Sequence, residues 1–283
     1  MIPGMRRVLL VGVIASLALP LARAQSSDET NQLARLLVLR SGMAVQIHAI
    51  PLQFEQSAAQ HRGRVPAHVI ALVTQAGKEA FQPAKLHEEV VRNVAGKMSP
   101  AAMREALGWL ESDVGRRVTA AEEDAATSAS EASMTRYLDG LKKRPPSQQR
   151  VKLIGDVMGV ANVVESSAGT LEALTLGIAV GFDAMQPREK QAGAAVLHSR
   201  LRDSNLRGQL LANLGAALPA LMLFTYRDVS DADLSAYVTF MQSSAGAQYT
   251  RVGLQAIEDA LVRASFRMGQ FMLKNAPAPR INT

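Results

Sequence analysis

"YVTFMQSSAGAQYT", residues 237–250, has a relative earlier in the same chain, "ALGWLESDVGRRVT", residues 106–119. When the comparison is widened to 99–119 against 230–250, five of 21 aligned positions are identical. About one or two identities are expected by chance, so the pattern indicates an internal duplication. The identical pairs are Ser99/Ser230, Ala101/Ala232, Ser112/Ser243, Gly115/Gly246 and Thr119/Thr250.

The repeated phrase predicts a joint between two helices. The first helix ends at a Ser whose hydroxyl accepts a hydrogen bond from the N–H three residues later, which starts a new helix. A Gly in the first turn of that new helix costs about 0.5–1 kcal/mol relative to Ala. We therefore expect a neighbour to pack directly on the Gly backbone, and the preceding aromatic residue is the predicted neighbour. The structural joint comprises Trp109, Ser112 and Gly115 in the first copy and Phe240, Ser243 and Gly246 in the second.

The second copy, Val229–Val252, resembles the bacterial domain-of-unknown-function family 2059. In that family a helix ends in an aromatic residue, which is followed by Ser, a small residue and Gly, and then by a second helix. Residues 98–119 resemble it more weakly, and Asp113 and Ser244 stand where the family often has Pro. The resemblance implies an exported protein, because members usually follow a signal peptide. It implies no chemistry, because the family has no established activity.

Composition predicts an all-α protein without a sheet. Aromatic residues make up 4% of the chain, helix-forming residues dominate, and alternating runs of Val, Ile and Thr are nearly absent. We expect two divergent six-helix repeats packed on each other. The helices are predicted at 29–40, 43–60, 66–77, 83–97, 100–111 and 113–139, and at 148–163, 167–184, 187–201, 204–223, 231–242 and 244–273. Repeat A then spans 25–140, a basic Pro-containing linker 141–147, repeat B 148–273, and a disordered tail 274–283.

The first 24 residues have the pattern of an export signal. Arg6 and Arg7 precede the apolar stretch Val8–Leu19, and Ala22-Arg23-Ala24 is a small-x-small cleavage site. We expect cleavage after Ala24 and a periplasmic or secreted protein. Because no later run reaches the ~20 apolar residues of a spanning helix, no transmembrane segment is expected in the mature chain. The chain has no Cys, so it forms neither disulfides nor thiolate metal sites.

The charge of the chain does not favour a nucleic-acid partner. The net charge is +6, and Arg6, Arg7 and Arg23 of the signal contribute three of those charges. The densest basic cluster also lacks interleaved aromatic residues for base stacking. That cluster either forms a solvated linker or docks on an anionic envelope surface. Its members are Lys142, Lys143, Arg144, Arg150 and Lys152.

No motif in the sequence predicts catalysis. His87-Glu88-Glu89 begins a zinc-protease pattern, but Val91 stands where the second His would be. No G-x-S-x-G and no phosphate-binding Gly loop occurs. We therefore predict no catalytic residue, no cofactor and no metal, and the chain is not expected to be an enzyme. A hydrolase without a recognisable motif is the third interpretation.

Two segments of repeat B are apolar on nearly all sides, Leu171–Phe182 and Leu210–Phe224. Such helices form a central core, or they line an apolar groove for a ligand or a partner. The sequence predicts a non-catalytic exported protein that binds an unknown protein or envelope component, or alternatively a carrier of a hydrophobic ligand in a groove of repeat B. A deep apolar cavity would favour the carrier. The groove residues would be Leu174, Ile178, Phe182, Leu218 and Met222.

The cleavage site gives a direct test of the predicted compartment. The exported protein is expected to begin at Gln25, because Ala22 and Ala24 suit the small pockets of signal peptidase. N-terminal sequencing of protein recovered from the cell envelope or medium checks this expectation. Protein that retains Met1 in every fraction would contradict it.

Overall fold

The computed structural model describes residues 18–60, 63, 65–126, 130–184 and 186–275. Over these residues the chain forms thirteen α-helices and one short 3-10 helix, without a β-strand, so the all-α prediction is confirmed. The first six helices are α1 (Ala18–Arg40), α2 (Met43–Gln60), α3 (Ala67–Ala80), α4 (Pro83–Lys97), α5 (Pro100–Leu110) and α6 (Asp113–Ala125). The others are α7 (Ser130–Lys143), α8 (Gln148–Val160), α9 (Val163–Ala184), η1 (Arg188–Lys190), α10 (Ala194–Leu201), α11 (Ser204–Thr225), α12 (Asp231–Gln242) and α13 (Ser244–Asn275).

Several predicted boundaries are wrong. The helix predicted at 113–139 is two helices, because α6 ends at Ala125 and α7 begins at Ser130. The helix predicted at 187–201 is reduced to the single turn η1 and the short α10. The first three residues of the predicted linker 141–147 belong to α7, and Lys274 and Asn275 of the predicted tail belong to α13. Residues 1–17 of the predicted signal and 276–283 of the tail lie outside the described residues.

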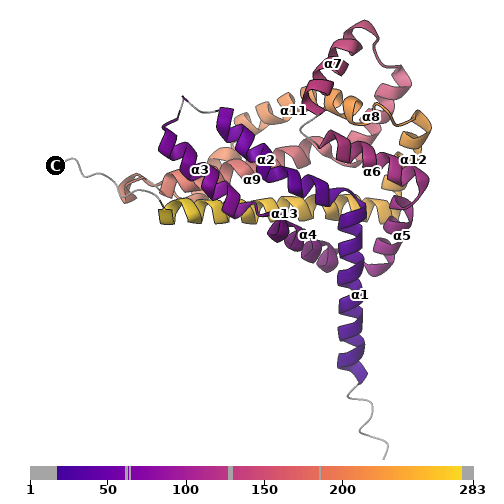
Figure 1. Cartoon of the computed structure of the whole chain (residues 1–283), viewed down its shortest axis with the longest axis horizontal. Coiled ribbons are helices and arrows are strands. Elements are labelled where there is room, and N and C mark those ends of the chain that lie inside the picture. The colour runs from indigo at the N-terminus through magenta and orange to yellow at the C-terminus, as the bar shows by residue number, and fades with distance from the viewer. Residues whose placement is uncertain (1–17, 61–62, 64, 127–129, 185, 276–283) are drawn as a thin grey trace, which may run out of the picture.

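Helix α13 is the element on which the core is built. It runs along the long axis of the molecule (Figure 1) and packs against α9 and α12 as well as α3, α4 and α5. Small buried residues at Ala256, Ala260 and Ala264 let these neighbours approach closely. At Gly177 of α9, a Cβ would overlap Ser265 of α13, so the two helix backbones are nearly in contact there. Because buried residues from both halves of the chain form one cluster, the halves share a single core.

Polar contacts also join the two halves. Glu89 of α4 is buried and pairs with Arg267 of α13 at 2.6 Å, and Lys97 pairs with Asp259 at 2.7 Å. Because Glu89 is withdrawn from water, the loss of its partner would leave a buried charge uncompensated.

Helix α1 has two different environments along its length. Its N-terminal part extends away from the body (Figure 1), whereas Ala34, Leu37 and Val38 are buried where α1 meets α4 and α5. The body of the protein therefore holds α1 through its second half.

Helices α9 and α11 are longer than the apolar runs that they contain. Among the described residues, Val163–Asp183 and Asn205–Thr225 are long and apolar enough to cross a membrane by length and composition. Helices α1 and α2, which meet at 65°, would add a third if they formed one broken span. The prediction that the apolar runs are too short to span is wrong on length, because each helix has 22 residues. The absence of a transmembrane segment stays a prediction.

The two related phrases form the same corner. Ser112 Oγ accepts a hydrogen bond from the Gly115 N–H at 3.0 Å, and Ser243 Oγ accepts one from the Gly246 N–H at 3.1 Å. A Cβ at either Gly would overlap the carbonyl oxygen of the preceding aromatic residue, Trp109 or Phe240. The neighbour that requires Gly is therefore this carbonyl and not the aromatic ring.

The aromatic residues of the two corners lie on each other. The rings of Trp109 and Phe240 are parallel within 5°, with centroids 4.3 Å apart. Ser99 and Ser230 cap the helices that lead into the corners, as their positions in the sequence predict. Equivalent residues of the two phrases thus meet face to face at the contact between α5 and α12.

The corner geometry predicts opposite effects for two Gly→Ala substitutions. Gly246→Ala should lower the free energy of unfolding by about 1–3 kcal/mol, because the new Cβ must displace the Phe240 carbonyl. Gly108→Ala should raise it by about 0.5–1 kcal/mol, because Gly108 lies inside α5 with open space around its Cα. Urea denaturation of both variants measures the difference. A Gly246→Ala variant as stable as Gly108→Ala would show that the corner backbone is not tightly packed.

Candidate functional site

A pocket of about 760 Å³ lies between α2, α6, α9, α11 and α13. Its exposed margin is apolar: Leu171, Leu221 and Leu254 line it and are 42%, 39% and 36% exposed. Its deeper wall carries the polar groups Glu122, Tyr226, Tyr237 and Tyr249, of which Tyr226 is only 2% exposed. The pocket therefore has an apolar mouth and a polar floor.

Glu122 of α6 is the centre of the floor. Its Oε1 accepts hydrogen bonds from the hydroxyls of Tyr226, at 2.7 Å, and Tyr237, at 3.1 Å. Removal from bulk water raises the pKa of the Glu122 carboxyl, and the two tyrosine hydrogen bonds oppose that rise only in part. Glu122 is therefore a carboxyl that accepts a proton more readily than an ordinary surface glutamate.

The three tyrosines remain protonated. Burial, together with the nearby Glu122 carboxyl, raises the pKa values of Tyr226, Tyr237 and Tyr249. Their hydroxyls thus act as hydrogen-bond donors at any physiological pH, and their rings give the floor an aromatic surface.

Contacts behind the floor hold two of these tyrosines. Trp109 stacks on Tyr237 with ring centroids 5.2 Å apart, so the paired corners position this ring. Arg150 donates to the carbonyl oxygens of Tyr226 and Val229 and pairs with Asp231 at 2.8 Å. The Arg150 guanidinium therefore binds the turn that carries Tyr226. It does not belong to the basic cluster that the sequence groups around the linker.

No basic side chain is found among the described residues that line the pocket. Glu122 is the only Asp, Glu, Lys, Arg or His among the described residues that line it. Within the same part of the chain, no Lys, Arg or His forms an ion pair with Glu122. The remaining polar lining consists of hydroxyls and one amide, which include Ser41, Ser166 and Thr250. The carboxyl therefore faces the cavity without a cationic partner among the residues that the structure describes.

The structure brings together some of the residues of the predicted groove. Leu218 and Met222 of α11 line the pocket. Leu174, Ile178 and Phe182 of α9 pack against the main core instead. The wall opposite α11 is formed by α2 and α13, so both halves of the chain contribute to a pocket that the sequence assigned to repeat B alone.

Glu122 was not among the predicted site residues, although the sequence carries a signal for it. In α6 the residues Gly115, Val118 and Thr119 are buried. Glu122 follows Val118 by one helical turn, so it falls on the stripe that faces the core. A carboxylate on an apolar stripe is unusual, and such exceptions to the pattern are expected at functional sites.

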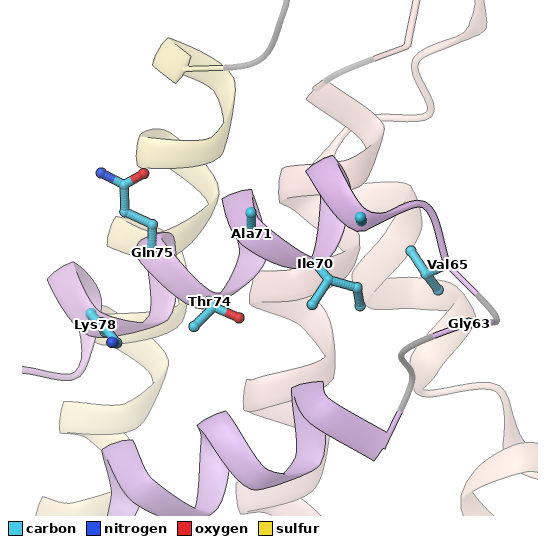
Figure 2. Close-up of a pocket in the computed structure, with 8 residues that line it drawn as sticks. Gly63, Val65, Ile70, Ala71, Thr74, Gln75 and Lys78 are labelled. Carbon is cyan, nitrogen blue, oxygen red and sulfur yellow. The ribbon is translucent and has the colours of Figure 1, made fainter.

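Two further hollows are less suited to a ligand. Figure 2 shows one whose lining residues all lie between Gly63 and Lys78, on α3 and the segment before it, so it is an open helix face. The other, of about 470 Å³, lies between α9, α10 and α13. Arg207 there pairs with both Glu165 and Glu172, so these three charged side chains are already engaged with one another.

The described part of the chain contains no cluster of side chains suited to a metal ion. No group of three or more His, Asp or Glu residues there is arranged to hold a metal ion. His198 lines the charged hollow beside Glu258, but no hydrogen bond joins it to a carboxylate in the described residues.

Comparison with known proteins yields no relative. No family model, curated protein or solved structure matches this chain. The resemblance of residues 229–252 to the domain-of-unknown-function family 2059 therefore stays a prediction, and the pocket must be interpreted from its own chemistry.

The raised pKa of Glu122 predicts a stability that depends on pH. A pKa that is higher in the folded state means that stability falls as pH rises from the ordinary carboxyl range through the folded-state pKa. Glu122→Gln replaces the titratable carboxyl with a neutral amide and keeps the shape of the side chain. Near the ordinary carboxyl pKa, the variant should therefore have the same free energy of unfolding as the wild type. At higher pH, the variant should be the more stable protein.

Urea denaturation at a series of pH values measures this effect. Glu105→Gln is the matched control, because Glu105 is an exposed residue of α5 outside the pocket. If the stability of both Glu122→Gln and Glu105→Gln varies with pH as that of the wild type does, burial does not raise the pKa of Glu122.

Proposed function

We propose that this chain is a non-catalytic carrier of an apolar small molecule, which it binds in the pocket above Glu122. The observation that carries the proposal is the pocket itself, about 760 Å³ in volume with an apolar mouth. Small-molecule sites typically measure about 300–1,000 Å³, with mostly apolar walls and a few convergent polar groups. The pocket has this size, and two of its tyrosine hydroxyls converge on one carboxyl.

The position of the mouth supports the same function. Leu171 and Leu221 at the margin come from α9 and α11, the two helices apolar enough to match a membrane. A ligand that moves between a lipid phase and the pocket would cross a mostly apolar surface at this edge. Burial of its apolar area would supply about 25 cal/mol per Å² toward binding.

The setting that we propose for this activity is the cell envelope. The support is the signal pattern of residues 1–24 and the resemblance of residues 229–252 to an exported family. We also propose that the two corner phrases descend from one duplicated unit, because their Ser caps and Gly contacts are equivalent. An envelope partner is a second proposal; it is favoured by exposed apolar side chains such as Leu206, which is 57% exposed on α11.

A pair of Trp substitutions on α11 tests the carrier function. Titration with a neutral fluorescent probe, N-phenyl-1-naphthylamine, should give saturable binding to the wild type. Met222→Trp should weaken that binding about tenfold or more, because the larger ring fills a pocket of limited volume. Leu206→Trp, on the same helix but outside the pocket lining, should leave the affinity unchanged.

Circular dichroism and a thermal melt establish that both variants are folded. Non-saturable binding to the folded wild type would refute a carrier. Equal weakening by both Trp variants would place the probe on the surface of α11 and not in the pocket.

A further inference from the structure

We propose that the ligand of this pocket is a hydrophobic cation, with an apolar body in the mouth and an ammonium group against Glu122 and its tyrosines. This inference rests on the proposed carrier function and names the chemical class of the cargo. It departs from the usual expectation for an apolar carrier, which is a fatty acid or a neutral lipid.

The charge of the pocket lining is the first argument. Glu122 is the only Asp, Glu, Lys, Arg or His among the described lining residues. A carboxylate ligand would place a second negative charge beside it, and like charges at short range in a poorly solvated pocket repel strongly. A ligand with an ammonium group instead supplies the positive charge that the lining lacks.

The hydrogen bonds of Glu122 are the second argument. Tyr226 and Tyr237 both donate to Oε1, and neither uses Oε2. These two donors orient the carboxyl without neutralising its charge. A carboxylate withdrawn from water is stable when it is both hydrogen-bonded and paired with a positive charge; half-buried Glu122 has the hydrogen bonds and, among the described residues, lacks the positive partner.

The aromatic surface is the third argument. Tyr226, Tyr237 and Tyr249 line the pocket together with Glu122. The π-faces of tyrosine rings attract ammonium groups, and aromatic cages are a common way for proteins to bind quaternary ammonium ligands. These rings are held by the paired corners behind them, since Trp109 stacks on Tyr237 and Phe240 lies 6.0 Å from Tyr249, centroid to centroid.

The mouth defines the other part of the ligand. Leu171, Leu221 and Leu254 are exposed around the opening, with Ile50, Leu218 and Met222 further along the lining. Helices α2, α9, α11 and α13 thus present an apolar channel that leads to the carboxyl. An alkyl chain or a fused apolar ring system that ends in an ammonium group matches this order of surfaces.

A series of ligands with the same chain and different head groups tests the inference. Dodecyltrimethylammonium, dodecanol and dodecanoate are used, below their micellar concentrations, to displace N-phenyl-1-naphthylamine from the full mature chain. The cation should displace the probe at about tenfold lower concentration than the alcohol, and dodecanoate should be the weakest. An alcohol or a carboxylate that matches the cation would overturn the inference.

Two variants assign the selectivity to Glu122. Glu122→Gln should reduce the preference for the cation over the alcohol to about twofold or less while the affinity for the alcohol stays the same. Glu105→Gln, which removes an equal charge from the exposed face of α5, should keep the wild-type preference. Retention of the full preference in folded Glu122→Gln would overturn the role of Glu122.

A calorimetric measurement on the wild type keeps the test independent of the variants. Over a series of pH values that starts at the ordinary glutamate pKa and rises from there, binding of the cation should ionise Glu122 and release a proton wherever the free carboxyl is partly protonated, which titration in buffers of different ionisation enthalpy detects. The other groups around Glu122 are Glu123, next in the chain, and Tyr226, Tyr237 and Tyr249, which keep their protons. Dodecyltrimethylammonium carries no titratable proton of its own, so binding without proton release would overturn the proposal.

The failure of this inference is distinguishable from the failure of the proposed function. If the neutral probe does not bind saturably, the chain is not a carrier. If the probe binds and the three head groups compete equally, the chain is a carrier whose floor does not select charge.

Discussion

The parallel contact between Trp109 and Phe240 is the interaction on which the rest of the structure depends. It exists because each ring precedes a corner where a Gly lets the next helix start directly on the aromatic residue's carbonyl oxygen. With Ala at Gly115 or Gly246, the corner would open and the rings would separate. Since Tyr237 also stacks on Trp109, the same contact fixes a hydroxyl that donates to Glu122. The backbone packing at the corners therefore positions Glu122 indirectly, through Trp109 and Tyr237.

The unfavourable contribution of this arrangement to stability comes from the Glu122 carboxyl. A Glu on the buried stripe of α6 loses hydration, and its protein neighbours return hydrogen bonds without a positive charge. An apolar residue of similar size at that position would be the more stable choice for a core alone. By contrast, Glu89 at the contact of α4 and α13 is paired with Arg263 and Arg267, which is how a buried carboxylate is stabilised when the fold alone requires it. The difference between the two acids separates a structural carboxylate from one that is available to a ligand.

The features that the sequence predicted correctly are those determined by residues close together in the chain. The helical class, the Ser caps and the need for Gly at the corners follow from residues within one or two helical turns of each other. The break after Ala125 was missed although the sequence marks it with Thr127, Ser128 and Ser130, residue types that favour the start of a helix. Most residues of the pocket were not predicted, because they lie far apart in the sequence. Glu122 is on α6, Tyr226 is in the turn after α11, and Tyr249 is on α13. Only Leu218 and Met222 were anticipated, since an apolar helix shows in the sequence while the helix that it faces does not.

The place of α13 in the core has a consequence for when the molecule can fold. Helix α13 follows every other described helix along the chain, yet it forms the surface against which α3, α4, α5 and α9 pack. Early helices of the nascent chain thus have no complete partner, and contacts between such distant segments form slowly. Packing of these helices into the core is therefore delayed until α13 has been made. That delay suits a polypeptide that must thread unfolded through a membrane channel, as the signal pattern of its first residues predicts.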